Sequence, residues 1–299
     1  MKNIVYFFIL GFFLFSCTAT NKAKTVPPAF DAQAHRGGKG LMPENTIPAM
    51  LHAIDLNVNT LEMDLQVTKD RQVIVSHDAS FNHNFTTTPD GKTLTPEESK
   101  KLLLYEMNYD DIKKYDVGMK YFADVPRQKK IAVQKPLLSD LLEATEKYAK
   151  QKGRVIFYNI EIKSNAKNDG KLHPPVEEFA DLALKVILAS GAAERVTIQS
   201  FDNRALQIVH KKYPQVKTSL LIEAKDKRSL DQQIKDLGFT PDAYSPHFSI
   251  VTPQLIQQCH QKNIKVIAWT VNDLDGLRRL KNMGIDAIIS DYPDLFAQM

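Results

Sequence analysis

The sequence predicts a (β/α)8 barrel, on three observations. Short runs of β-branched and apolar residues alternate with segments of helical periodicity, as in βα units built around a parallel sheet. Eight such units fit into the roughly 270 residues after position 30, the usual length of one barrel of this kind. The composition is that of a globular protein, with 43% hydrophobic and 25% charged residues in a chain of 299. A doubly wound open sheet is the alternative arrangement of the same units.

Each strand is assigned from an apolar run, and each helix from the amphipathic segment that follows it. The predicted strands are 31–35, 60–66, 154–162, 195–200, 217–223, 242–246, 264–270 and 286–290. The predicted helices are 46–56, 138–150, 176–190, 203–212, 228–237, 253–262, 274–282 and 292–298.

One interval breaks the alternation. From His77 to about Lys135 the chain is first polar, FNHNFTTTPDGKTLTPEESKKL, and then rich in Tyr and Asp. A connection of that length without secondary structure is rare in a compact domain unless it has a functional role. The sequence therefore predicts an insertion at about 80–135, after the second strand, that forms a small cap near the strand ends. Thr95-Pro96-Glu97-Glu98 predicts a helix start inside it, with an N-cap threonine and proline at the first helical position.

The first sixteen residues are predicted to be a signal peptide. Met1-Lys2-Asn3 precedes an apolar run, Ile4 to Phe15, that is short for a membrane span and suited to a signal sequence. Leu14-Phe15-Ser16-Cys17 resembles a bacterial lipobox, so lipidation of Cys17 is expected, with residues 17–29 as a tether and 30–299 as the barrel domain. The expected location is the bacterial cell envelope, anchored to a membrane on the periplasmic or outer-membrane side. An ordinary secretory peptide or a short anchor helix is the alternative.

Charge and cysteine content argue against a nucleic-acid-binding protein and against a fold held by disulfides. The net charge of +4 comes from 39 basic and 35 acidic residues scattered along the chain, unlike the concentrated positive surface of a nucleic-acid-binding protein. Lipidation of Cys17 would leave Cys259, and one thiol cannot form an internal disulfide. Cys259 is therefore predicted to be a core or helix-face thiol in a fold without disulfides.

The second predicted strand carries two carboxylates on one face. In Leu61-Glu62-Met63-Asp64-Leu65 the period of two places Glu62 and Asp64 together and the apolar residues opposite. Two inward carboxylates about 7 Å apart along a strand repel each other and have raised pKa values unless a cation lies between them. A hard divalent ion is the simplest such cation. An exposed edge strand with two solvated acids is the alternative.

The same alternation recurs in Asn159-Ile160-Glu161-Ile162-Lys163, with the polar residues facing inward. Glu161 would supply a third carboxylate to an oxygen-rich site. Lys163 lies one step nearer the carboxyl end of the strand, where it is placed to meet an anion. A surface ion pair between the two is the alternative.

Two histidines end apolar runs. His77 closes Val73-Ile74-Val75-Ser76-His77-Asp78, and His35 closes the first predicted strand at the same rim, after the small residues Ala32 and Ala34. A histidine titrates near neutrality and can transfer a proton. Either histidine taken alone has a structural role as its alternative.

Together these motifs resemble the glycerophosphodiester phosphodiesterase family. HRG followed by PENT, then LEMDLQVTKDRQVIVSHD, then NIEIK have the family's order and spacing, and the resemblance extends from about Asp31 to Asp294. It implies a TIM barrel with its site at the carboxyl ends of the strands. It also implies a divalent cation, commonly Ca2+ or Mg2+, as cofactor.

The resemblance further implies roles for individual residues. These are Glu62, Asp64 and Glu161 as metal ligands, His35 and His77 as catalytic histidines, and Arg36 and Lys163 as contacts to the substrate phosphate. Trp269 would form part of the pocket wall, with plain core packing as its alternative. Glu44 is expected to reach the metal shell or a substrate hydroxyl, and Asn45 either caps the following helix or has a functional role.

The implied reaction is metal-dependent hydrolysis of a small-molecule glycerophosphodiester to an alcohol and glycerol-3-phosphate. Arg36 offers a rigid fork of donors to phosphate oxygens, and Gly37 and Gly38 let the backbone approach closely. In the family a neighbouring glycerol hydroxyl attacks and gives a cyclic phosphate that water later opens. One histidine takes the proton of the attacking hydroxyl and the other protonates the leaving alcohol, and the sequence does not say which does which.

Two alternative functions remain. One is a membrane-tethered module that binds phosphodiesters without turning them over. The other is a lipid phosphodiesterase of phospholipase D type, for which Tyr121-Phe122 and Lys129-Lys130 in the insertion argue. The expected partners are the diester and, through the lipid anchor, a membrane.

Overall fold

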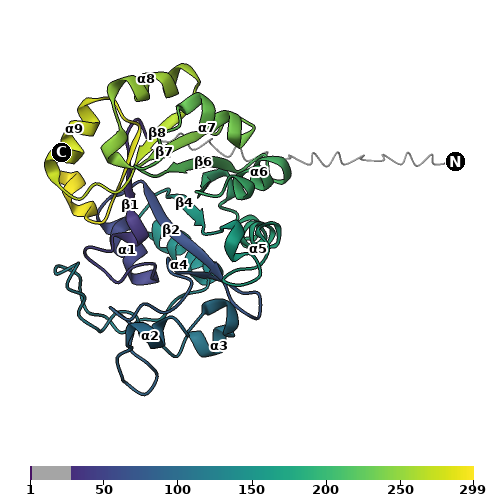
Figure 1. Ribbon diagram of the computed structural model, residues 1–299, viewed down its shortest axis with the longest axis vertical. Coiled ribbons are helices and arrows are strands. Elements are labelled where there is room, and N and C mark those ends of the chain that lie inside the picture. Colours follow the sequence, from purple (N-terminus) through teal and green to yellow (C-terminus); the bar gives the residue numbers. More distant parts are fainter. Residues whose placement is uncertain (2–27) are drawn as a thin grey trace.

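Eight parallel strands close into a barrel in the computed structural model, which describes Met1 and residues 28–299 (Figure 1). The first and last strands pair with each other, so the sheet has no open edge and the predicted (β/α)8 barrel is confirmed over the open sheet. In barrel order the strands are β1 (Asp31–Ala34), β2 (Thr60–Val67), β4 (Phe157–Ile162), β5 (Val196–Ser200), β6 (Lys217–Ile222), β7 (Ala243–Pro246), β8 (Lys265–Ala268) and β9 (Ala287–Ser290). The predicted signal segment after Met1, Cys17 and the predicted tether up to residue 27 lie outside the described residues.

Helices cover the outside of the barrel. They are α1 (Ile47–Asp55), α4 (Leu138–Gln151), α5 (Val176–Ala189), α6 (Asn203–Lys212), α7 (Leu230–Leu237), α8 (Pro253–Gln261) and α9 (Leu274–Asn282). Short 3-10 turns join some of them to strands: η3 (Ala166–Asn168), η4 (Ala193–Arg195) and η5 (Phe248–Ile250). The predicted helix 292–298 is wrong in type, because the last segment is a 3-10 helix, η6 (Pro293–Gln298), as is common for short terminal pieces. Within residues 28–299 no helix has the length and apolar character that crossing a membrane requires.

The main hydrophobic core lies between the strands and the helices. Leu61, Met63 and Leu65 on β2 are fully buried there, as is Phe179 on α5. Burying a side chain of this size contributes about 1.5–3 kcal/mol to stability. Cys259 on α8 is fully buried in the same core, as predicted for a core thiol. Because strand residues alternate, packing Leu61, Met63 and Leu65 outward turns the residues between them into the barrel.

The short strand β3 (Val73–Val75) is antiparallel to the end of β2 and is not a barrel strand. The segment 76–137 follows it and holds α2 (Pro96–Ser99), η2 (Leu104–Glu106) and α3 (Tyr109–Ile112). The predicted helix start is present, since Thr95 and Glu98 form a capping box at α2. The segment lies at the bottom of the view in Figure 1, below α4. It has a hydrophobic cluster of its own, formed with Ile74 by Phe81, Phe85, Leu94, Leu104, Ile112 and Val117.

The barrel interior is polar on one side and apolar on the other. On the polar side Asn159 donates to Gln33 Oε1 (2.9 Å) and to Gln199 Oε1 (3.1 Å), and Gln199 Nε2 donates to Glu62 Oε1 (2.9 Å). This chain of amides leads to Glu62, towards the carboxyl ends of the strands. The opposite side is filled by a buried apolar cluster from β7, β8 and β9: Ala243, Ile267, Ala287 and Ile289.

Candidate active site

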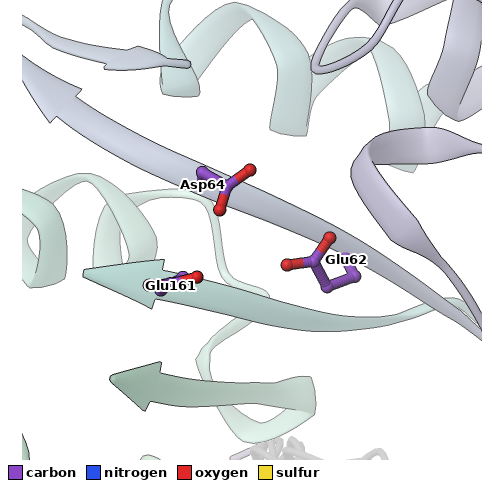
Figure 2. Close-up of side chains that lie close together, drawn as sticks. All are labelled: Glu62, Asp64 and Glu161. Atoms are coloured by element: carbon purple, nitrogen blue, oxygen red, sulfur yellow. The ribbon is translucent and has the colours of Figure 1, made fainter. Parts of the chain in front are cut away.

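Three carboxylates from two neighbouring strands converge inside the barrel. Glu62 and Asp64 project from β2, and Glu161 projects from β4 at the position paired with Asp64. One oxygen from each lies within 4.8 Å of the others, and all three residues are buried. Figure 2 shows the carboxylates pointing into the same space. The predicted convergence of these side chains is therefore present, and Glu62 and Asp64 are not on an exposed edge strand.

The protonation of these carboxylates shows why the cluster suits a cation. Burial, and then the charge of Asp64, raises the pKa of Glu62 well above its usual range. Burial also raises the pKa of Glu161. Burial opposes ionisation of Asp64 too, but the positive charges of Lys163, His77 and Arg36 outweigh it and hold the Asp64 pKa below its usual range. An all-oxygen, buried and mutually repelling donor set fits a hard divalent cation, which would replace the protons that burial favours.

The chain turns sharply after β1 to bring backbone and side chains to this cluster. The 3-10 turn η1 (His35–Gly37) has Arg36 in the left-handed region at φ 51°, followed by Gly37 at 78°. A Cβ on Gly37 would lie 2.8 Å from the Ala49 Cβ, so the close approach of the turn to α1 requires glycine. The turn directs the Arg36 backbone N–H to Glu62 Oε2, at 2.7 Å.

The Arg36 side chain lies between two acidic groups. Its Nη1 donates to Glu44 Oε1 at 2.9 Å, and its Nε lies 3.4 Å from Asp64 Oδ2. The buried Nε finds no hydrogen-bond acceptor among the described residues. The Arg36 Nε therefore faces Asp64 as an ion pair without a full hydrogen bond. Glu44 contacts Arg36 and does not join the three-carboxylate cluster, so its expected reach into the metal shell is not seen.

Asn45 and Lys163 also contact the cluster. Asn45 donates to Asp64 Oδ2 at 2.9 Å and accepts from the Asp64 backbone N–H, whereas Thr46 is the N-cap of α1. The capping alternative for Asn45 is therefore wrong. Lys163 Nζ lies 3.1 Å from Glu161 Oε1 and 3.6 Å from Asp64 Oδ1. Lys163 and Glu161 are thus paired inside the site and not on the surface.

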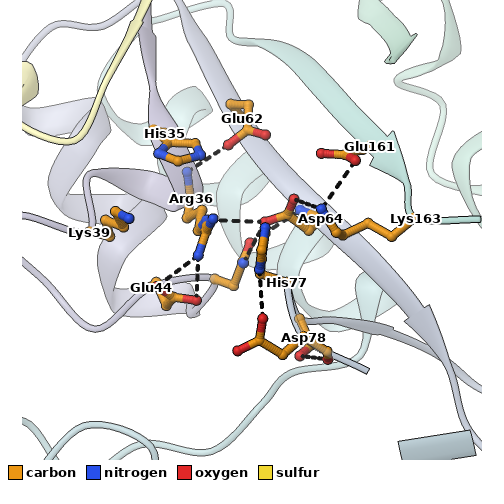
Figure 3. A network of polar contacts seen from close by, with 12 residues as sticks. His35, Arg36, Lys39, Glu44, Glu62, Asp64, His77, Asp78, Glu161 and Lys163 are labelled. Atoms are coloured by element: carbon orange, nitrogen blue, oxygen red, sulfur yellow. Dashed lines mark hydrogen bonds and ion pairs between the residues drawn. The ribbon is translucent and has the colours of Figure 1, made fainter. Parts of the chain in front are cut away.

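The two predicted histidines both lie beside the carboxylate cluster (Figure 3), and each is held by an Asp that an Asn contacts in turn. His35 Nδ1 is 2.5 Å from Asp291 Oδ1, and Asn272 donates to Asp291 Oδ2 at 2.7 Å. Burial raises the Asp291 pKa, but hydrogen bonding with His35 outweighs it and holds that pKa below its usual value. An ionised carboxylate only accepts, so the proton of the contact resides on His35 Nδ1 and Nε2 is left for the site.

His77 repeats this arrangement closer to solvent. Its Nδ1 is 2.8 Å from Asp78 Oδ1, and Asn82 donates to Asp78 Oδ2 at 2.8 Å. The side chain of His77 is 32% exposed, against 15% for His35. Burial, then the positive charge of Arg36, lowers the pKa of His35 and so favours its neutral form. The two histidines therefore differ in exposure while each is held at Nδ1 by an aspartate.

Trp269 lies at the end of β8, on the apolar side of the barrel. Its Nε1 donates to the Ser245 carbonyl at 2.8 Å, and its ring meets the rings of Phe201 and His247 edge to face. It also packs on the apolar interior cluster. Trp269 is thus held as a fixed part of the rim, with core packing on one side.

Sequence reasoning missed the partners of the predicted residues. Asp291 and Gln199 were assigned no role from the sequence, yet Asp291 holds His35 and Gln199 holds Glu62. The signal was available, because both continue the inward alternation of β9 and β5 that identified Glu62 and Asp64. Asp78 was visible as the neighbour of His77.

Comparison with known proteins gives the same picture over nearly all of the described chain. The sequence model of the glycerophosphoryl diester phosphodiesterase family matches residues 35–295. A glycerophosphodiester phosphodiesterase of Caldanaerobacter subterraneus is 30% identical over 264 residues, which are 87% of this chain and 93% of the relative.

Solved structures share the fold. A Silicibacter pomeroyi protein superposes with a TM-score of 0.80 at 27% identity, covering 92% of this chain and 96% of its own. An Oleispira antarctica phosphodiesterase, solved in complex with the product sn-glycerol-3-phosphate, has a TM-score of 0.71 at 22% identity, covering 90% of this chain and 95% of its own.

Proposed function

The chain belongs to the glycerophosphoryl diester phosphodiesterase family, and we propose that it hydrolyses glycerophosphodiesters to an alcohol and sn-glycerol-3-phosphate with a divalent cation, Ca2+ or Mg2+, as cofactor. The observation that carries this proposal is the meeting of three buried carboxylates with two Asp-held histidines at one end of the barrel. A binding module needs charge complementarity to a phosphodiester, but it has no need for two imidazoles with fixed tautomers.

Arg36 and Lys163 are the proposed contacts to the phosphate. Both are cations beside the carboxylate cluster, where each pairs with Asp64. When bound to Glu62, Asp64 and Glu161, the cation would neutralise charge on a phosphoryl oxygen. The two side chains then orient the diester so that its leaving oxygen and attacking hydroxyl meet different histidines.

His35 and His77 are the proposed base and acid. Neutral His35 accepts the proton of the attacking hydroxyl at Nε2, because burial favours its neutral form. His77, which is more exposed, donates a proton from Nε2 of its protonated form to the departing alkoxide, and the cyclic phosphate that results is then opened by water to sn-glycerol-3-phosphate. Asp291 and Asp78 hold the two Nδ1 protons throughout, so each imidazole presents one nitrogen to the substrate.

The experiment that tests the proposal is direct. The full chain, purified in detergent, is incubated with glycerophosphocholine, glycerophosphoethanolamine or glycerophosphoglycerol, with Ca2+, Mg2+ or chelator. We expect sn-glycerol-3-phosphate with cation alone. Turnover in chelator would overturn the cofactor assignment, and binding without turnover of any diester would favour the binding module.

Matched variants test the histidine roles. His35→Asn and His77→Asn should each lower kcat by about 10²–10⁴-fold, the usual contribution of general acid–base catalysis. His260→Asn is the control, because His260 on α8 also pairs with an aspartate, Asp286, but plays no part in the site. Equal activity of all three variants would contradict the assignment.

A lipid diester is the second candidate substrate, favoured by two exposed apolar side chains. Met119 is 51% and Tyr121 56% exposed in the segment 76–137, and Lys130 lies over the Tyr121 ring. The same assay with lysophosphatidylcholine in mixed micelles decides the matter. We expect slower release of choline or lysophosphatidic acid than of sn-glycerol-3-phosphate from the deacylated diesters.

Lipid anchoring is proposed from the sequence of residues 1–17 and places the enzyme in the bacterial cell envelope. Metabolic labelling with a tagged fatty acid should mark the wild-type chain and not Cys17→Ser. Labelling that persists in the variant would contradict the assignment.

A further inference from the structure

Lys135 is a buried lysine beside the site that the proposed mechanism does not use. The residue is 6% exposed, and its Nζ donates to Ser76 Oγ at 2.9 Å. The rings of Phe81 and Phe85 flank the ammonium group, with centroids 5.6 and 6.0 Å away. Among the described residues no carboxylate lies within ion-pair distance of Lys135 Nζ. Burying a cation without a close counter-charge costs free energy, so its retention calls for a function.

The contacts of Lys135 lead to the turn that carries His77. Ser76 Oγ, which accepts from Lys135, donates in turn to the Asp78 carbonyl at 2.9 Å. On the same side, the Val75 backbone N–H donates to the Pro136 carbonyl at 3.0 Å. Lys135 and Pro136 therefore hold Ser76 and Val75, the two residues that precede His77 and Asp78.

Charge acts in the same direction as these contacts. The charged groups that face Lys135 are Glu44, Asp78 and Asp64, which favour its protonated form, and Arg36, which opposes it. Burial raises the Asp78 pKa, but the His77 contact, the Asn82 hydrogen bond and the charge of Lys135 hold it below its usual range. An ionised Asp78 is what keeps the proton of His77 on Nδ1.

We propose that Lys135 is a positioning residue for His77, whose ammonium group fixes the Ser76–Asp78 turn and keeps the Nδ1 proton of His77 directed at Asp78. The catalytic consequence rests on the proposed hydrolysis, because it requires His77 to present Nε2 to the leaving group. The geometric part does not, since it concerns the tautomer of one imidazole.

The test replaces Lys135 with a neutral side chain of similar length, Lys135→Met, in the full chain in detergent. Imidazole ¹⁵N NMR of histidine-labelled protein reads the tautomer, with the His77 signals assigned from their loss in His77→Asn. In alkaline buffer, where the imidazole is neutral, we expect wild-type His77 to be the Nδ1–H tautomer and Lys135→Met to show a mixture of both. Lys101→Met, which removes an exposed lysine from the same segment, should match the wild type.

Kinetics separate positioning from substrate binding. Lys135→Met should lower kcat by about 10–100-fold, the usual effect of removing an outer partner of a catalytic group, with KM within about 2-fold. In the His77→Asn background the same change should cause no further loss, because both act through one imidazole. Additive losses would overturn the proposal, as would a higher Kd for sn-glycerol-3-phosphate with unchanged kcat, which would make Lys135 a direct phosphate contact.

If Lys135→Met does not fold, Ser76→Ala breaks the same link without touching the lysine and should give the same tautomer mixture; an unchanged tautomer in Ser76→Ala would then count against the proposal. If the wild-type chain hydrolyses no diester, the proposed function fails, while the NMR result still decides whether Lys135 sets the tautomer of His77.

Discussion

The two sides of the barrel interior fill the same kind of space by different means. On the side of β1, β2, β4 and β5, buried amides and carboxylates satisfy one another through hydrogen bonds. On the side of β7, β8 and β9, small and branched apolar residues pack together without polar contacts. A hydrogen-bonded interior fixes the direction of each side chain, whereas an apolar interior fixes only its volume. The side that holds Glu62 needs fixed side-chain orientations, because a metal site is sensitive to the placement of each oxygen.

The largest effect is expected at Glu62. Glu62→Gln removes one ligand charge from the polar side and should lower turnover by about 10³-fold, equivalent to about 4 kcal/mol in the barrier. In the metal-free variant, relief of the buried Glu62 charge is opposed by the loss of one of its two acceptor oxygens, so the unfolding free energy should stay within about 1 kcal/mol of the wild type. Isothermal titration with Ca2+ or Mg2+ and thermal unfolding measure the two effects. A variant that keeps full turnover would contradict the metal assignment.

The next largest effect is expected at Gln199, which holds the proposed metal ligand Glu62. Gln199→Leu removes the donor to Glu62 and the acceptor from Asn159, and should lower kcat by about 10–100-fold. It should also cost about 1–3 kcal/mol of unfolding free energy, because Asn159 loses a partner. Ser219→Ala on β6 is the control: its buried hydroxyl has no partner among the described residues, so stability should change by less than about 0.5 kcal/mol.

A smaller effect is expected on the apolar side. Ile289→Val on β9 removes one buried methyl group and should cost about 1 kcal/mol of stability. Its kcat at 25 °C should equal that of the wild type, because the substitution does not change the orientation of any side chain in the site. Urea unfolding and steady-state kinetics on the same preparation check both. A fall in kcat comparable to that of Gln199→Leu would erase the distinction between the two sides.

The smallest effect is expected on the pH dependence of stability at Lys135, in the segment 76–137. Burial lowers the pKa of Lys135 in the folded protein, so between that pKa and the usual value near 10.4 the unfolded chain binds more protons. Wild-type stability therefore rises with pH across this window.

Lys135→Met lacks this dependence. It should be about 0.5 kcal/mol more stable than the wild type at pH 7, with part of the gain offset by the lost Ser76 contact. The advantage should shrink towards pH 10. Urea unfolding at pH 7 and pH 9.5 measures it, and a deficit that grows with pH would contradict the sign.

Much of the architecture could be predicted because strand alternation is local. Leu61 to Leu65 and Asn159 to Lys163 each show a period of two, and that period alone turns the carboxylates to one side. The strand Val73–Val75 is the instructive exception, because its composition suits a barrel strand. Only residues 68–72 separate this strand from β2, whereas a parallel crossover connection needs a dozen or more residues. The antiparallel pairing of this strand with β2 could therefore have been predicted.

The partners of the site residues were harder to predict because they depend on closure of the barrel. Asp291 is 256 positions from His35, and no local pattern links them. Lys135 gave no signal at all, since a single lysine before Pro136 resembles any loop cation. Its burial arises from packing against Phe81 and Phe85, which only the tertiary structure brings together.

The pairing of β1 with β9 has a consequence for the order of assembly during translation. A ribosome that has released β2 and β4 has already delivered every carboxylate of the cluster, but the aspartate that orients His35 follows the final strand. Contacts of such long sequence separation form late and slowly. The nascent chain therefore contains the three carboxylates first and the aspartate partner of His35 last, which leaves unfinished copies without a complete reaction centre.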